Sequence, residues 1–153
     1  MSPPDSGPVE RDRIRVVAGA LVHAGGRLLV ERGRDEARGE DFYRVIGGGV
    51  EFGESAEDAV VREWREEYGL TLSVVARLGV LENRFTYEGR PGHEIVFVFA
   101  ATVAEAWATK REAFTCTDEQ GALHEAAWMP VAELRIGAIP LYPLGVLDLL
   151  PET

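Results

Sequence analysis

The segment GGGVEFGESAEDAVVREWREEYGL, residues 47–70, decides how the rest of the chain is interpreted. It joins a glycine-rich stretch to a strongly acidic one. Ser55, with Asp58 three residues later, predicts a capped helix that begins near residue 56, and Gly69 is a natural helix end. At about 100° per residue, one arc of this helix is apolar and should pack on a sheet. That arc holds Val60, Val61, Trp64 and Tyr68.

Three glutamates, Glu63, Glu66 and Glu67, share a flank of the same helix. Like charges three or four residues apart repel, and the negative end of the helix dipole further disfavours them. One interpretation is a solvated surface cluster that Arg62 and Arg65 neutralise. The other is a site for a divalent cation, which binds several carboxylate oxygens. The glycine stretch favours the cation, because such loops let the backbone approach a ligand closely.

From Gly48 to Leu70 the chain resembles the Nudix box of the MutT-like hydrolases. That pattern is Gly, five residues, Glu, seven residues, then Arg-Glu-hydrophobic-any-Glu-Glu-any-Gly-hydrophobic. The matching positions are Gly48, Glu54, Arg62, Glu63, Glu66, Glu67 and Gly69, with Trp64 and Leu70 in the hydrophobic positions. Ile46 stands where many members of the family have proline, and we expect this difference to alter loop stiffness rather than chemistry.

The resemblance implies an α/β fold of the α+β kind, an α/β/α sandwich with a mixed sheet between helices in one domain. It also implies hydrolysis, dependent on Mg²⁺ or Mn²⁺, of a nucleoside diphosphate linked to another group. The implied metal ligands are the carbonyl of Gly47 and the carboxylates of Glu63, Glu66 and Glu67. The implied catalytic residues are Glu63 and Glu66, with Glu54 and Arg62 as the pair that orients the loop and Glu63.

Residues outside the box are candidates for binding the substrate. Arginine offers a planar fork of donors to phosphate, and we select Arg32 and Arg44 near the glycine stretch, together with Tyr87. The aromatic residues that could stack on a base, or else belong to the core, are Phe42, Tyr43, Phe85 and Tyr87. Some family members use a further glutamate from a late loop, for which Glu119 and Glu125 are the candidates. For both residues, the sequence favours a solvated surface acid over this role.

The remaining elements follow from periodicity and turn residues. We expect a hairpin of strands 14–23 and 27–32, a charged loop 32–41 and a short extended segment 42–46. Further strands are predicted at 70–81, 82–88, 94–103 and 126–130, with an ambiguous polar segment from 105 to 125. A helical turn at 131–135 and a terminal helix at 142–150 complete the chain.

Composition limits the possible partners. With 153 residues and a net charge of -10, the chain is unsuited to general binding of DNA or an acidic membrane surface. The single Cys116 and the absence of an apolar signal or membrane segment predict a cytoplasmic protein. We expect a flexible arm at residues 1–12, a Nudix domain at 13–153 and a nucleotide-type small-molecule substrate, and we leave open whether the protein is a monomer or a homodimer. A non-catalytic module that senses nucleotides or RNA is the alternative function.

Overall fold

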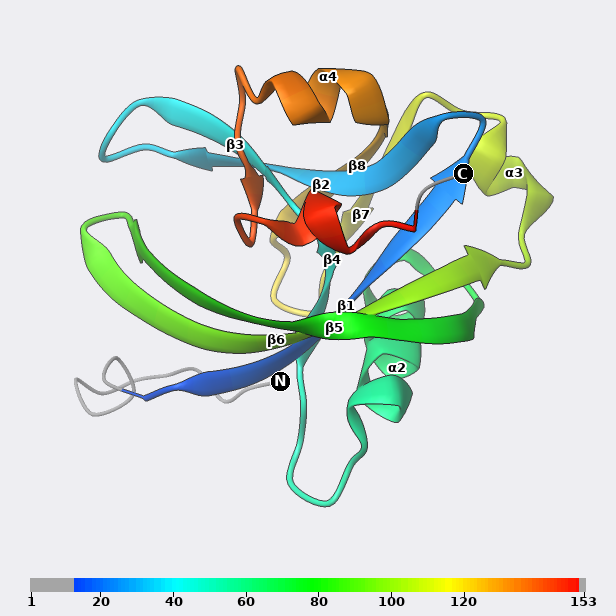
Figure 1. The fold of residues 1–153 in the computed structure, drawn as a ribbon, viewed down its shortest axis with the longest axis horizontal. Helices are drawn as coiled ribbons and strands as arrows, with labels where there is room; N and C mark the ends of the chain where they lie inside the picture. Colours follow the sequence, from blue (N-terminus) through cyan, green and yellow to red (C-terminus); the bar gives the residue numbers. More distant parts are fainter. Residues whose placement is uncertain (1–12, 152–153) are drawn as a thin grey trace.

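Nine strands form one connected mixed sheet within residues 13–151, the part of the chain that the computed structural model describes (Figure 1). The strands are β1 (Arg15–Ala24), β2 (Arg27–Asp35), β3 (Glu40–Arg44), β4 (Ile46–Gly49), β5 (Leu72–Tyr87), β6 (Arg90–Val103), β7 (Ala113–Thr117), β8 (Leu123–Pro130) and β9 (Leu141–Tyr142). The helices are α2 (Ala56–Tyr68), α3 (Ala106–Thr109), α4 (Val131–Ile136) and the 3₁₀ helix η1 (Val146–Leu149). The predicted arm at residues 1–12 lies outside the described residues.

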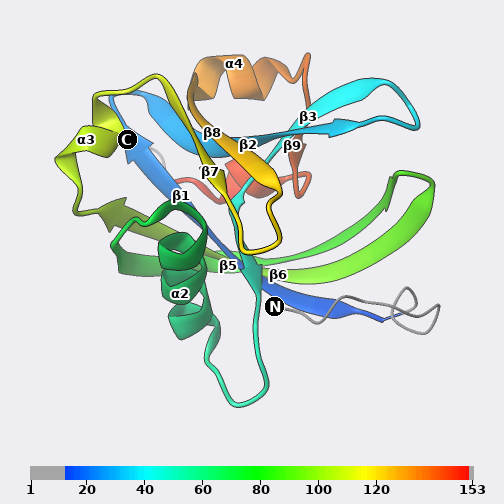
Figure 2. The ribbon, with the colours of Figure 1, turned by 180° about the vertical axis from the view of Figure 1, so that it is seen from behind.

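The β1 strand is the centre of the fold. It pairs with β6 in parallel and with β4 in antiparallel orientation, while β2 pairs with β3 and β8. Because neighbouring residues of a strand face opposite sides, β1 contributes to two cores. Ala18 and Ala20 pack with α2, whereas Leu21 packs with β2 and α4 residues. Helix α2 and helix α4 lie on opposite sides of the strands (Figures 1 and 2), which confirms the predicted layered architecture.

Helix α2 has the predicted ends and the predicted buried face. The Ser55 hydroxyl accepts the Asp58 N–H at 3.0 Å, and Gly69 closes the helix with a φ of 68°. Trp64 is fully buried, and its indole N–H donates to the Ile46 carbonyl at 2.9 Å. This bond holds the glycine strand β4 against the helix that carries the glutamates.

Three predicted elements differ from the structure. The charged loop 32–41 is mostly strand, because β2 and β3 continue as an antiparallel ribbon that Arg34 and Asp41 support with a 2.9 Å ion pair. Most of its polar residues are exposed and it has no apolar alternation, so the sequence pattern did not indicate strands. The strands predicted at 70–81 and 82–88 are one long strand, β5, with two irregularities in its pairing. The terminal helix 142–150 is wrong, since β9 and only one short 3₁₀ turn occupy it, and Gly145 has a φ of 89°.

The β2–β3 and β5–β6 hairpins project to the same side of the molecule (Figure 1). Their tips are joined by hydrogen bonds: the Glu36 N–H donates to the Glu88 carboxylate at 2.6 Å, and the Glu88 N–H donates to buried Asp35 at 3.4 Å. The two hairpins therefore enclose a space that begins at β4 and α2. No helix within residues 13–151 is long and apolar enough to cross a lipid bilayer.

Candidate active site

The glycine strand β4 lies in direct contact with the acidic flank of α2. A Cβ atom on Gly48 would lie 2.3 Å from the Glu63 carboxyl carbon, closer than side chains tolerate. A Cβ on Gly47 would lie 1.9 Å from the Ala18 carbonyl oxygen in β1. Glycine is therefore required at both positions for steric reasons, and it brings the Glu63 carboxylate against the β4 backbone.

Arg62 is the centre of a hydrogen-bond network beside these glycines. Its guanidinium donates to both oxygens of Glu54, at 2.8 and 2.9 Å, and to the Gly49 carbonyl at 3.0 Å. It also donates to Glu63 at 2.8 Å and to Glu66 at 3.1 Å. These partners raise the pKa of Arg62, foremost through the bonds to Glu54, so its charge is permanent. The structure thus brings together the four residues that the sequence analysis assigned to catalysis.

The third glutamate of the box belongs to a different group. Oxygens of Glu67 and Glu31 and a ring nitrogen of His124 lie within 4.8 Å of one another. Glu31 is only 3% exposed and accepts from the Tyr68 hydroxyl at 2.5 Å and from Arg44 at 2.7 Å. Strands β2 and β8 contribute Glu31 and His124, so this group combines segments that are far apart in the chain.

The surroundings shift the pKa values of Glu31, Glu67 and His124 in different directions. Burial would raise the pKa of Glu31, but Arg44, the Tyr68 hydroxyl and His124 hold it below its ordinary value. Burial and the nearby charge of Glu31 raise the pKa of Glu67 to about 8. His124, whose ring bonds to Asp118 at 2.8 Å, has a raised pKa because that bond and the carboxylates outweigh its burial.

Among the described residues, the donor group that lies close enough to share one divalent cation is Glu31, Glu67 and His124, and it includes Glu67 of the predicted ligands but not Glu63 or Glu66. Glu67 is only 18% exposed, and the nearest cationic group in the described residues is His124 at 3.9 Å. Burial and the negative charge of Glu31 disfavour the ionised form of Glu67, which is why its pKa is raised. A cation bound beside Glu67 would favour the ionised form instead. Carboxylates of Glu63, Glu66 and Glu67 and the carbonyl of Gly47 are oxygen donors of the kind Mg²⁺ prefers.

The predicted substrate residues separate into two groups. Arg44 and Tyr87 line the cavity between the hairpins, although the Arg44 guanidinium is bound to Glu31. Arg32 is not among the lining residues, because it alternates with Glu31 on β2 and points to the opposite face. There it donates to Glu125 at 2.8 Å, so neither of this pair lies in the cavity. Of the two late-loop candidates, only Glu119 lines the cavity.

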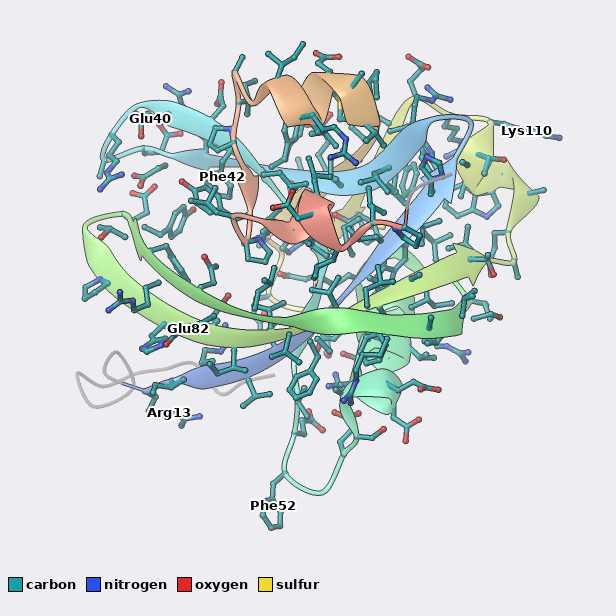
Figure 3. The ribbon with its side chains drawn as sticks, in the orientation of Figure 1. Arg13, Glu40, Phe42, Phe52, Glu82 and Lys110 are labelled. Atoms are coloured by element: carbon teal, nitrogen blue, oxygen red, sulfur yellow. The ribbon has the colours of Figure 1, made fainter. Side chains whose placement is uncertain are left out.

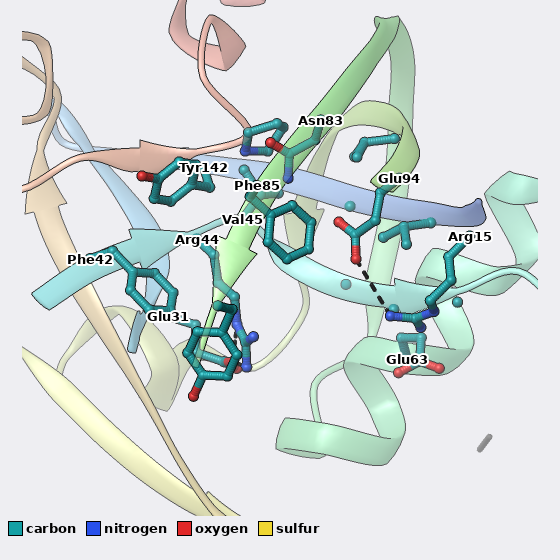
Figure 4. Close-up of a pocket in the computed structure, with 18 of the residues that line it drawn as sticks. Arg15, Glu31, Phe42, Arg44, Val45, Glu63, Asn83, Phe85, Glu94 and Tyr142 are labelled. Atoms are coloured by element: carbon teal, nitrogen blue, oxygen red, sulfur yellow. Dashed lines mark hydrogen bonds and ion pairs between the residues drawn. The ribbon is translucent and has the colours of Figure 1, made fainter. Parts of the chain in front are cut away.

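The cavity extends from the glutamates to the aromatic ends of the hairpins. Its volume is about 1720 Å³, larger than the roughly 300–1,000 Å³ of most small-ligand pockets, so it has room for a ligand with two parts. Phe42 lies between β3 and the β5–β6 hairpin (Figure 3), with its ring edge-on to Tyr87 and Tyr142. Figure 4 shows Glu63 on one side of the cavity and Phe42, Phe85 and Tyr142 on the other. Tyr43, the remaining aromatic candidate, belongs to the core.

Sequence reasoning did not identify Glu31, His124, Asp118 or Asn83, all of which line the cavity. Glu31 carried a usable signal, since it is the one acid in the apolar run of residues 28–31. His124 and Asp118 lie in a polar segment with no periodicity. The pairing of β8 with β2 brings His124 to Glu31, and the bond between Asp118 and His124 brings Asp118 beside them.

Comparison with known proteins agrees with this geometry. The NUDIX domain family model matches residues 13–147. The chain is 32% identical over 141 residues, 87% of its length, to the NAD-capped RNA hydrolase NudC of Mycobacterium tuberculosis. It is 40% identical over 76 residues, half of its length, to the ADP-ribose pyrophosphatase of Methanocaldococcus jannaschii. The chain spans only 43% of the length of each of these relatives.

A solved structure with the same fold is the MutT NUDIX hydrolase from Burkholderia pseudomallei. The TM-score is 0.64 and the identity 26%, and the match covers 90% of this chain and 97% of that one. The family model spans most of the chain and includes the glycine strand, Arg62 and the glutamates. The chain therefore belongs to the Nudix family.

Proposed function

We propose that the protein is a hydrolase, dependent on Mg²⁺ or Mn²⁺, that cleaves the diphosphate bond of a nucleoside diphosphate linked to another group. The observation that carries this proposal is the placement of Glu63 against the glycine strand. There Arg62 ties Glu63, Glu54 and Glu66 together at the mouth of a large cavity. A pure binding pocket would not require this arrangement of acids.

In this proposal, Gly47, Glu63, Glu66 and Glu67 hold the metal. When bound, the metal neutralises the charge of the diphosphate and lowers the pKa of its water. Glu63 and Glu66 are the candidates for the base that removes the water proton. Arg62 and Glu54 keep Glu63 in one orientation through bonds of 2.8 to 2.9 Å.

Substrate binding is assigned to the other end of the cavity. Tyr87 lines it on the β5–β6 hairpin, whereas Arg44 lines the cavity beside Glu31 and shares its charge with that carboxylate. Arg32 is no longer proposed, because it lies outside the cavity and is paired with Glu125. The related proteins named for NAD-capped RNA and ADP-ribose support a nucleoside diphosphate linked to a second group. Nucleotide sugars, dinucleoside polyphosphates and nucleoside triphosphates are the other members of the class to test.

The test is release of a nucleoside monophosphate from a panel of these compounds, with and without Mg²⁺. We expect turnover that requires the metal and falls by at least about 100-fold in Glu67→Gln, which keeps the size of the side chain but removes its charge. Glu57→Gln is the matched control, because Glu57 is an exposed acid of the same helix that does not line the cavity. If wild type and Glu67→Gln bind a nucleotide equally and neither hydrolyses any compound, the protein is a sensor and the proposal is wrong.

A further inference from the structure

Asn83 is a buried polar residue without a partner. It lies in β5, is only 9% exposed and lines the cavity. Within residues 13–151, its side-chain amide makes no hydrogen bond. The same described region contains no inaccessible side-chain nitrogen or oxygen that lacks a partner, so the Asn83 amide must retain contact with the cavity.

The position of Asn83 in the strand makes an asparagine costly. Leu81, Asn83, Phe85 and Tyr87 alternate along one face of β5, and Leu81 packs on the core that Val96 also joins. An apolar side chain at position 83 would continue that core, whereas the amide is left with only the limited access to water that the cavity gives it. This polar side chain stands where the cavity meets the core, at a position that an apolar residue would fill more favourably. A ligand group that supplies the missing partners would account for it.

Two aromatic rings line the same cavity as Asn83, Phe85 two residues along β5 and Phe42 in the facing hairpin. Phe85 lies over Gly92 of the paired strand β6, where a Cβ atom would come within 2.3 Å of the ring. In the facing hairpin, Phe42 lies over Gly33 of β2, where a Cβ would come within 2.4 Å. The outer end of each ring therefore occupies the space that a side chain of the paired strand would otherwise fill. Both rings line the same cavity (Figure 4), so a planar group can lie against them.

We propose that Asn83 reads the nucleobase of the substrate and that the preferred base is adenine. The amide presents one donor and one acceptor side by side, and adenine offers an N–H donor next to a ring nitrogen acceptor, the pair that asparagine binds with two hydrogen bonds. Phe42 and Phe85 supply stacking that is independent of the base. This inference rests on the proposed function for the nature of the substrate, and it adds the residue that selects the base.

The experiment measures binding, so that it does not depend on hydrolysis. Dissociation constants for AMP, GMP, CMP and UMP are determined by calorimetry for the wild type and for Asn83→Leu, which keeps the volume and removes both hydrogen-bonding groups. Glu82→Leu is the matched control, because Glu82 is exposed on the other face of β5 and pairs with His93 at 2.7 Å outside the cavity. Phe85→Ala tests the stacking contribution.

We expect the wild type to bind AMP at least about 10-fold more tightly than the other three nucleotides, and Asn83→Leu to lose this preference. Glu82→Leu should retain it, and Phe85→Ala should weaken all four nucleotides by a similar factor of about 10 or more. Asn83→Leu should also melt at the same temperature as the wild type or higher, since it removes an unpaired buried amide. A merely structural asparagine would give the opposite shift in melting temperature.

Several results would overturn the inference. If Asn83→Leu still prefers AMP as strongly as the wild type does, Asn83 does not select the base. If the wild type prefers GMP, the assignment of adenine as the preferred base is wrong. Selective AMP binding without hydrolysis of any diphosphate compound would refute the proposed function and support the base reader. If the wild type instead hydrolyses the diphosphate compounds whatever their base and binds all four monophosphates equally, the result would support the proposed function and refute the role of Asn83.

Discussion

Gly48→Ala adds one methyl group at the point where β4 faces the Glu63 carboxylate. The new carbon would lie 2.3 Å from both the carboxyl carbon and one carboxylate oxygen of Glu63, and 2.8 Å from its Cγ. Carbon atoms in contact prefer about 3.5–4.0 Å, so the carboxylate must retreat by more than about 1 Å. The Glu63 side chain can make this movement, and the backbone of β4 need not.

The displacement of the Glu63 carboxylate should lower the catalytic rate strongly and lower the stability of the fold only slightly. A displacement of about 1 Å in a positioned catalytic group costs roughly 100-fold in rate, and we expect kcat/KM to fall by about that factor. The fold should lose only the 2.8 Å bond between Arg62 and Glu63, worth about 1.5–3 kcal/mol for a charged pair and less where water reaches it. The melting temperature should therefore fall by only a few degrees.

The assay is metal-dependent hydrolysis of whichever compound in the substrate panel turns over, together with thermal unfolding. Gly49→Ala is the control, because a Cβ at that position meets only the end of the Arg15 side chain, at 3.1 Å. It should retain most of the activity. If Gly48→Ala keeps wild-type kcat/KM, the close packing of Glu63 on the glycine strand has no catalytic role, and the reasoning fails.

Three further predictions concern the scaffold. Gly47→Ala should destabilise the protein far more than Gly48→Ala, because its Cβ would lie 1.9 Å from a backbone oxygen that cannot move, and urea unfolding measures the difference. Trp64→Phe should lower the unfolding free energy by about 1–3 kcal/mol, because it leaves the buried Ile46 carbonyl without its donor. The Thr71 N–H and hydroxyl lower the pKa of Glu105, so the stability advantage of wild type over Glu105→Ala should be present at pH 7 and decline as the pH falls below about 4.5. An advantage independent of pH would contradict that assignment.

Local patterns in the sequence were sufficient for the helix and its acids. The Ser55 cap, the Gly69 terminus and the buried face of Trp64 and Tyr68 all depend on residues within a few turns of one another. The spacing of Glu63, Glu66 and Glu67 along that helix also follows from its period. These features were predicted correctly because short-range hydrogen bonding and helical geometry determine them.

The charged hairpin and the chain end show where local patterns fail. Residues 32–41 have no apolar alternation, and the cross-strand pairs of Arg34 and Asp41 hold them extended. The segment 142–150 looks helical, but the pairing of Arg44 with Tyr142 makes its first residue part of a strand. Strand pairing joins residues distant in sequence, so propensity within one segment cannot reveal it.

Sequence alone determined that this chain resembles the Nudix box, with an acidic helix after a glycine-rich stretch. Only the tertiary structure decided that Glu31 and His124 join Glu67, that Arg32 faces away from the cavity, and that Asn83 enters it without a partner. The physical reason is that helix period and capping act over a few residues. The side of a strand that becomes buried depends instead on register and packing across the whole sheet.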